Sequence, residues 1–189
     1  VPTQFRVNAD KMWSNFMVTP AGYSKTPQDG YFFGNFSKPN VFFNQVDTNI
    51  VQNYRSQYLT FAYEFSSRND KAKTNEVLNR MDSNFPMKVV PYDYRILYDV
   101  CMLYYKADNI AKFNELSPAV EKEAIDAMKK NPNDMQTYWN PYKLLLDIYE
   151  VRGDYNRSLD ILYQLDRLSP NNPEVKMKIE AMKLKQQGK

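Results

Sequence analysis

Three carboxylates, Glu64, Asp93 and Asp99, are the side chains in this sequence best suited to acid–base chemistry. Hydrolysis of a glycosidic bond, for example, needs two carboxylates on opposite sides of the bond. Asp93, however, follows Pro91 at the expected start of a helix, where a carboxylate accepts hydrogen bonds from free backbone N–H groups and meets the positive end of the helix dipole. We therefore interpret Asp93 as a helix cap and predict no catalytic residue in this chain.

Aromatic rings offer a second kind of chemistry, because they can stack on sugar rings or anchor a protein interface. Tyr92 and Tyr94 flank Asp93, and the chain has two tryptophans, Trp13 and Trp139. Rings at helical spacing usually fill a core, which argues against sugar stacking. A carbohydrate-binding module is therefore only an alternative to a protein-binding function.

The composition excludes several common classes of active site. The 189 residues include no histidine, which removes the commonest general base and metal ligand. The single cysteine, Cys101, lies among apolar residues and is expected to be buried, and the five glycines lack the spacing of a nucleotide-binding loop. We therefore expect no cofactor and no metal. Lys and Arg (25) nearly balance Asp and Glu (22), so we expect no nucleic-acid partner.

Apolar residues recur with the i, i+3, i+4, i+7 spacing of amphipathic helices, in three pairs of segments. The first stripes are Tyr58, Phe61, Ala62 and Phe65; Leu97, Val100, Cys101 and Tyr104; and Tyr142, Leu145, Leu146 and Tyr149. The second stripes are Thr74, Val77, Leu78 and Met81; Phe113, Leu116, Ser117 and Val120; and Ser158, Ile161, Leu162 and Leu165. The pattern predicts an all-α fold.

A short turn signal separates the two stripes of each pair: Asn69-Asp70, Asp108-Asn109 and Gly153-Asp154. Asn or Gly tolerates the left-handed conformation that ends one helix, and Asp or Asn then caps the next helix. Such helical hairpins are typical of the tetratricopeptide repeat. The first stripes begin at residues 58, 97 and 142, so the three repeats are expected to be irregular.

The chain divides into two predicted parts. Residues 1–46 form an aromatic-rich, loop-rich segment packed on the repeats, with a short helix over Asp10–Met17. Residues 47–189 form the tetratricopeptide-like domain, with units at 47–86, 91–131 and 136–170 and a polar capping helix at 173–187. Pro118 is expected to kink or restart the second helix of the middle unit.

One edge of each first helix is expected to line a concave groove, as in other helical repeats. Tyr and Arg most often anchor protein interfaces, so the groove is predicted to bind a protein or peptide segment. The alternative is that the tyrosines fill gaps between helices. The predicted groove residues are Ser56, Leu59, Tyr63, Arg95, Tyr98, Met102, Tyr105, Lys143, Asp147 and Glu150.

Several short motifs follow one another over residues 5–130. They are the run Asn8–Met17, Phe33-Gly34-Asn35, Pro39-Asn40-Val41-Phe42, Asn53-Tyr54-Arg55 and Val90-Pro91-Tyr92-Asp93-Tyr94. Their order resembles the C-terminal region of a family of bacterial multi-pass membrane proteins of unknown function, whose membrane part is similar to glycosyltransferases that use lipid-linked sugars. Two features depart from that family: a glycine pair is reduced to Gly34-Asn35, and residues 50–52 lack a basic side chain.

The resemblance implies an extracytoplasmic tail on the periplasmic side, tethered to the inner membrane through a missing upstream region. The chain itself would then be a soluble, non-catalytic scaffold attached to a glycosyltransferase-like protein. A free-standing tetratricopeptide adaptor or lipoprotein and a carbohydrate-binding module remain as alternatives. The sequence does not predict an oligomeric state.

Overall fold

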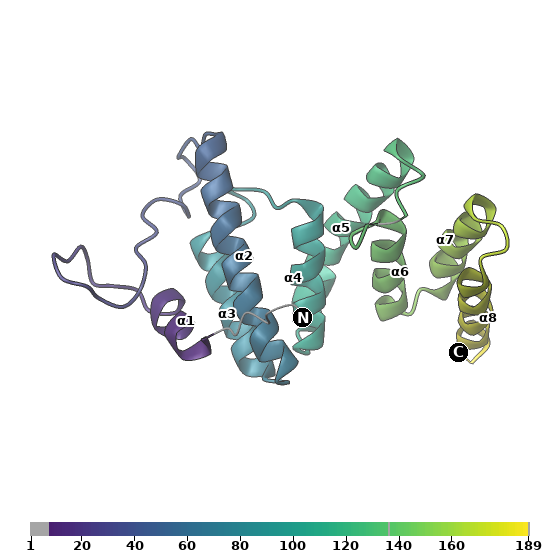
Figure 1. The fold of residues 1–189 in the computed structure, drawn as a ribbon, viewed down its shortest axis with the longest axis horizontal. Helices are drawn as coiled ribbons and strands as arrows, with labels where there is room; N and C mark the ends of the chain where they lie inside the picture. Colours follow the sequence, from purple (N-terminus) through teal and green to yellow (C-terminus); the bar gives the residue numbers. More distant parts are fainter. Residues whose placement is uncertain (1–7, 136, 189) are drawn as a thin grey trace, which may run out of the picture. The chain divides into compact units, whose positions relative to one another are not determined.

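The computed structural model describes residues 8–135 and 137–188, which form eight α-helices and no β-strand (Figure 1). The helices are α1 (Ala9–Phe16), α2 (Gln45–Ser67), α3 (Lys71–Asn84), α4 (Tyr94–Lys106), α5 (Ile110–Lys130), α6 (Pro141–Arg152), α7 (Tyr155–Leu168) and α8 (Pro173–Gln187). The predicted all-α class is therefore confirmed.

The chain separates into two compact units, Val1–Asn114 and Glu115–Lys189, which we call the first unit and the second unit. This division lies within α5 and does not coincide with the predicted boundary at 46/47. Residues 8–44, which precede α2, belong to the first unit. The Tyr58 hydroxyl donates a 2.9 Å hydrogen bond to the carbonyl of Phe16, and the Trp13 ring meets Phe61 and Phe65 edge-on.

The three predicted turns share one backbone geometry. Asn69, Asp108 and Gly153 have positive φ angles of 57°, 58° and 65°. In each turn the next N–H reaches back to a carbonyl five residues earlier: Asp70 to Phe65 (2.9 Å), Asn109 to Tyr104 (2.8 Å) and Asp154 to Tyr149 (2.8 Å). The side chains of Asp70, Asn109 and Asp154 then accept N–H groups of the following helix. Each turn therefore provides hydrogen-bond partners for a carbonyl at the end of one helix and for an N–H group at the start of the next.

The predicted apolar stripes form the cores. Every residue of the stripes in α2, α3 and α4 is buried. Leu116 in α5, Leu146 in α6 and Leu165 in α7 are half-buried, and the other members of those three stripes are buried. Cys101 is fully buried, as expected from its position on a stripe.

Helix α5 continues through Pro118 to Lys130, so the expected restart of the helix at this proline is wrong. Proline removes one backbone N–H and usually kinks or breaks a helix. Here Val120 and Ala124 are both fully buried beyond the proline. Their burial stabilises the helical conformation on its C-terminal side.

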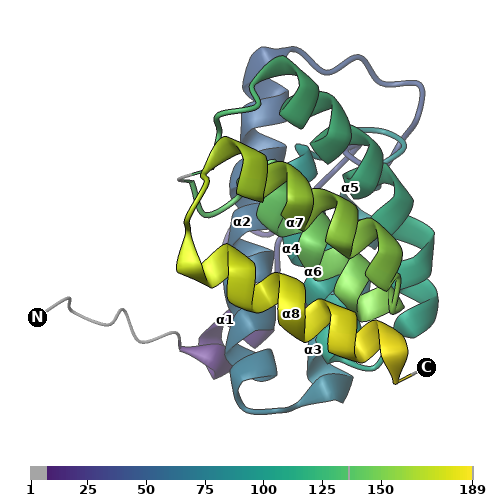
Figure 2. The same ribbon diagram turned by 90° about the vertical axis from the view of Figure 1, so that its right-hand side faces the viewer.

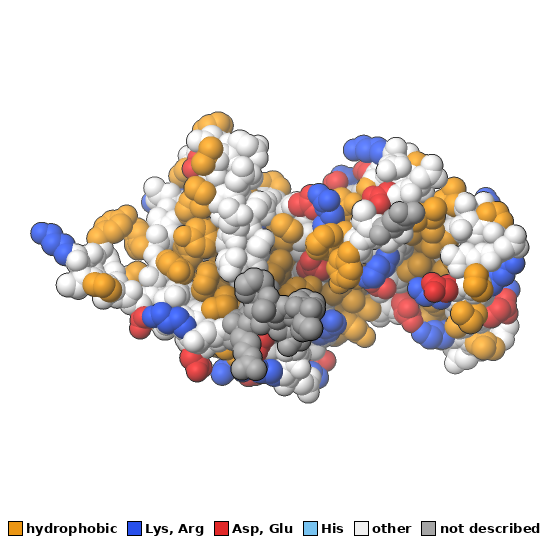
Figure 3. Space-filling view, viewed as in Figure 1, with side chains coloured by type: hydrophobic (Ala, Val, Ile, Leu, Met, Phe, Trp, Pro, Cys, Tyr) orange, Lys and Arg blue, Asp and Glu red, His pale blue; other side chains and the backbone are white. Residues whose placement is uncertain are grey.

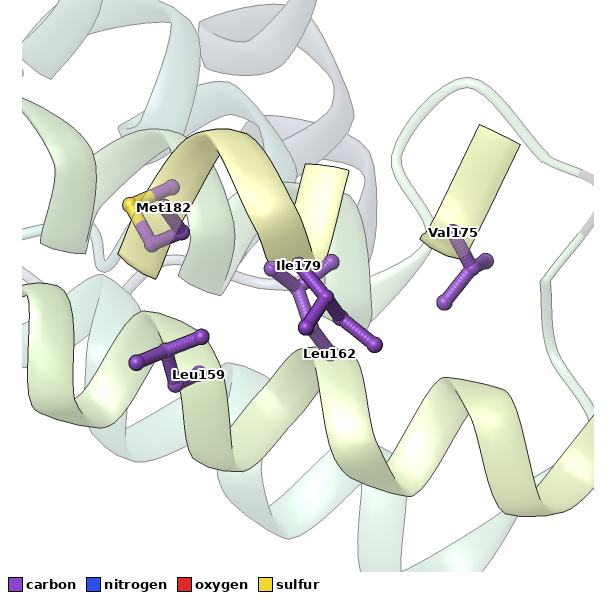
Figure 4. Packing of buried hydrophobic residues seen from close by; sticks show 5 residues of the cluster. All are labelled: Leu159, Leu162, Val175, Ile179 and Met182. Atoms are coloured by element: carbon purple, nitrogen blue, oxygen red, sulfur yellow. The ribbon is translucent and has the colours of Figure 1, made fainter. Parts of the chain in front are cut away.

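Helices α7 and α8 lie side by side in the second unit (Figures 1 and 2). Val175, Ile179 and Met182 face Leu159 and Leu162 of α7 (Figure 4). Helix α8 has the bounds predicted for the capping helix, and on its opposite face Met177 and Leu184 are 65% and 69% exposed. Apolar residues therefore occupy two opposite faces of α8.

Candidate functional site

Seven of the ten predicted groove residues lie on α2 and α4, which contact each other in the first unit. Ser56, in the middle of α2, and Arg95, in the first turn of α4, are exposed. Tyr63 and Tyr105 are 39% and 37% exposed, and Met102 is half-buried. The five accessible side chains, Ser56, Tyr63, Arg95, Met102 and Tyr105, form the α2/α4 face of the first unit.

Leu59 and Tyr98 were predicted to line the groove, and this assignment is wrong. They are only 6% and 4% exposed and belong to the core. Each directly follows the first residue of its stripe, Tyr58 or Leu97, on a helix that contacts more than one neighbour. A helix packed on several sides buries a wider stripe than one packed on a single side, so these positions are inaccessible to a partner.

The remaining groove residues lie on α6 in the second unit. The ammonium group of Lys143 is 2.8 Å from a carboxylate oxygen of Asp147, one helical turn away. Glu150 forms an ion pair with Lys185 of α8. Both pairs are partly exposed, and such pairs contribute little to stability.

The most unusual polar group of the first unit is Arg55, which the groove prediction did not include. Its side chain is fully buried and donates hydrogen bonds to the carbonyls of Phe85 (2.7 Å), Val90 (2.6 Å) and Pro91 (3.3 Å). The guanidinium carbon lies 3.8 Å from the centroid of the Tyr92 ring. Burial lowers the pKa of Arg55 and raises the pKa of Tyr92 to about 12. Arg55 therefore attaches α2 to the segment that leads into α4.

The three candidate acid–base residues have different surroundings. Asp93 is the N-cap of α4, where it accepts the backbone N–H of Arg95 (3.0 Å) and two guanidinium N–H groups of the same residue. These hydrogen bonds hold the pKa of Asp93 below its usual value. Glu64 pairs with Arg68 one turn away, and Asp99 is buried. The interpretation of Asp93 as a cap is confirmed.

The aromatic rings considered for sugar stacking have different surroundings. Trp13 packs against Phe61 and Phe65, and Tyr92 packs against Arg55. Trp139 is 38% exposed and contacts the Tyr138 ring at 5.1 Å. Sugar stacking requires an open ring face, so Trp139 is the more accessible tryptophan for it.

A charged cluster ties three helices of the second unit together. The Glu121 carboxylate on α5 accepts hydrogen bonds from Arg152 of α6 and Arg157 of α7, both at 2.5 Å, and from the Tyr149 hydroxyl at 3.1 Å. Burial and the Glu121 charge raise the pKa of Tyr149. Both Arg side chains therefore have an acidic partner within the second unit.

Within residues 8–135 and 137–188, no group of His, Cys, Asp and Glu side chains could hold a metal ion. None of the helices in this described part of the chain combines the length and hydropathy needed to cross a membrane. The sequence matches no family model, and no curated protein or solved structure is significantly similar to it.

Proposed function

We propose that this chain is a non-catalytic scaffold of tetratricopeptide-like helical hairpins that binds a protein or peptide segment. The support is the α2/α4 face, on which Tyr63 and Tyr105 are exposed to similar extents and to which Arg95 and Met102 also belong. Rings, Met and Arg are enriched where proteins bind one another. The predicted second-unit residues Lys143, Asp147 and Glu150 are proposed as a separate contribution from α6.

The resemblance of the N-terminal motifs adds a location to this proposal. We propose that the chain is the extracytoplasmic tail of a membrane-embedded glycosyltransferase-like protein, tethered to the inner membrane by an upstream region. The reading frame upstream of Val1 tests this directly. Several hydrophobic spans would support it, whereas a signal peptide with a lipid-attachment cysteine would instead support a free-standing lipoprotein.

Peptide selection tests the binding function and requires no identified partner. A displayed library of random peptides is selected against the whole chain, and the recovered peptides are measured by calorimetry. Because truncating an interface anchor often costs about 2 kcal/mol or more, Tyr63→Ala combined with Tyr105→Ala is expected to weaken binding at least about 30-fold.

Tyr163→Ala is the matched control, because Tyr163 on α7 is 40% exposed, close to the values for Tyr63 and Tyr105. It is expected to leave affinity unchanged. Recovery of peptides whose affinity is insensitive to Tyr63 and Tyr105, with circular dichroism showing an intact fold, would contradict binding at the α2/α4 face.

A further inference from the structure

A second surface of the first unit lies where α2 begins, apart from the residues of the α2/α4 face. A pocket of about 170 Å³ opens there. It is lined by Asn35, Phe36, Val41, Phe42, Phe43 and Asp47. The stacked rings of Phe36 and Phe43, 5.8 Å apart and inclined by 19°, contribute to this lining. The pocket is comparable in size to a cavity of about 150 Å³ that accepts benzene, so it has room for one phenyl ring.

Apolar side chains project next to this pocket. Phe42, which precedes α2, is 88% exposed although it lines the pocket. In α2 itself, Val46 in the first turn is 65% exposed and Ile50 one turn further on is 38% exposed. Figure 3 shows hydrophobic side chains gathered at the upper end of α2, which is its N-terminal end. A projecting phenyl ring and a phenyl-sized pocket are thus neighbours on one surface.

This surface is also unusually poor in charge. Asp47 is the only charged residue between Pro39 and Tyr54, whereas 25% of the whole chain is charged. One oxygen of Asp47 already accepts the backbone N–H of Asn44 (3.1 Å) in the capping box of α2. Charge depletion and apolar area characterise the cores of homodimer interfaces, where identical surfaces must meet without repulsion.

We propose that this surface binds a second copy of the chain, with Phe42 of each copy inserted into the α2 pocket of the other. A two-fold axis requires a self-complementary surface, and a projecting phenyl ring next to a pocket of matching size meets that requirement. The occupant of the pocket is therefore the Phe42 ring of the partner copy. This self-association is independent of the α2/α4 face and of the proposed function.

Sedimentation equilibrium over a range reaching about 1 mM protein tests the proposal, because one inserted ring per copy supports only weak association. The weight-average mass of the whole chain is expected to rise from one copy toward two. Phe42→Ala is expected to weaken association at least tenfold while leaving circular dichroism and thermal unfolding unchanged. Salt is expected to have little effect, because no ion pair is needed across the interface.

Tyr23→Ala is the matched control, since Tyr23 is 90% exposed and its ring contacts Phe32 rather than the pocket. It is expected to associate like the parent chain. A monomer throughout the concentration range would overturn the proposal and leave the pocket to a different partner. Equal weakening by Tyr23→Ala and Phe42→Ala would overturn it as well, since non-specific hydrophobic contacts would then account for the association.

Photocrosslinking identifies the occupant of the pocket. With p-benzoylphenylalanine in place of Phe42, illumination is expected to produce an adduct of two copies attached within residues 35–47. The same substitution at Tyr23 is expected to produce no such adduct. Attachment of the residue 42 probe outside the pocket residues would refute the proposed insertion even if the chain is a dimer.

Discussion

Arg55 places a positive charge inside the first unit among three backbone carbonyls and the ring of Tyr92. Removing a buried charged donor leaves its acceptors without hydrogen bonds, and this is more costly than losing an exposed contact. The carbonyls belong to residues 85–91, which are distant in sequence from α2. Arg55 is therefore expected to hold α2 against residues 85–91, although no local sequence pattern links these two segments.

Arg55→Met tests this role. The substitution is expected to lower the free energy of unfolding of the first unit by about 3 kcal/mol, because three carbonyls lose their donors. Urea unfolding followed by Trp13 fluorescence, in a Trp139→Phe background, measures this unit. Arg68→Met removes only the partly exposed ion pair with Glu64 and is expected to cost less than about 1 kcal/mol. Equal effects of the two substitutions would refute the role assigned to Arg55.

Asp93 predicts a pH dependence. Hydrogen bonding to Arg95 is the main cause that lowers the pKa of Asp93 in the folded chain. The stabilisation from the charged carboxylate is therefore fully present above the unfolded-state pKa and is lost as pH falls through the folded-state pKa. Asp93→Asn keeps a cap but removes the charge, and is expected to cost about 0.5 kcal/mol at neutral pH. In urea unfolding the difference from the parent chain should shrink progressively as the pH is lowered below the ordinary carboxyl range, toward the lowered folded-state pKa. A difference that does not shrink would contradict this role of the charge.

The helix-ending turns explain how this chain forms three helical hairpins with a glycine in only one of the three turns. Asn69 and Asp108 adopt the left-handed conformation that Gly153 adopts in the last turn. Asn and Asp tolerate this conformation better than other non-glycine residues such as alanine. Each turn also caps the following helix, so one short signal determines both ends of a hairpin.

Gly153→Ala is expected to destabilise the chain by about 1–2 kcal/mol, because alanine is strained at a φ angle of 65°. Gly22→Ala is the control, since a Cβ at Gly22 would meet nothing within 4 Å and its φ is not in the left-handed region. Thermal unfolding measured by circular dichroism should separate the two variants. Similar melting temperatures would contradict the assigned strain.

Helix α8 provides a comparison between two faces of one element. Ile179→Ala removes a side chain from the cluster with Leu159 and Leu162 and is expected to cost about 2–4 kcal/mol. Met177→Ala changes an exposed side chain and is expected to cost less than about 0.5 kcal/mol. Chemical unfolding of the second unit followed by Trp139 fluorescence measures both. Comparable losses would indicate that the outer face is also packed.

Local patterns were sufficient to predict the helices and their turns. The stripes repeat within two helical turns, and each turn signal involves adjacent residues, so both are visible in sequence. Leu59 and Tyr98 were misassigned because their burial depends on how many helices surround α2 and α4. The importance of Arg55 was likewise missed, because its acceptors are thirty or more residues away.

At the scale of the whole molecule, each of the two units has its own buried core, and the predicted groove residues are divided between them. The first unit carries the α2/α4 face and, separately, the pocket at the start of α2. Positive and negative side chains are nearly balanced in the chain. The proposed binding is therefore expected to depend on specific contacts by aromatic side chains more than on the overall charge.

Site-specific photocrosslinking in cells that produce the protein tests the central claim, that the α2/α4 face binds a protein partner. A p-benzoylphenylalanine probe at Tyr105 is expected to give a discrete adduct with another protein, because this ring is exposed on that face. The same probe at Tyr163, which is similarly exposed on α7, is expected to give none. Absence of an adduct at Tyr105, or an identical adduct at both positions, would contradict the account.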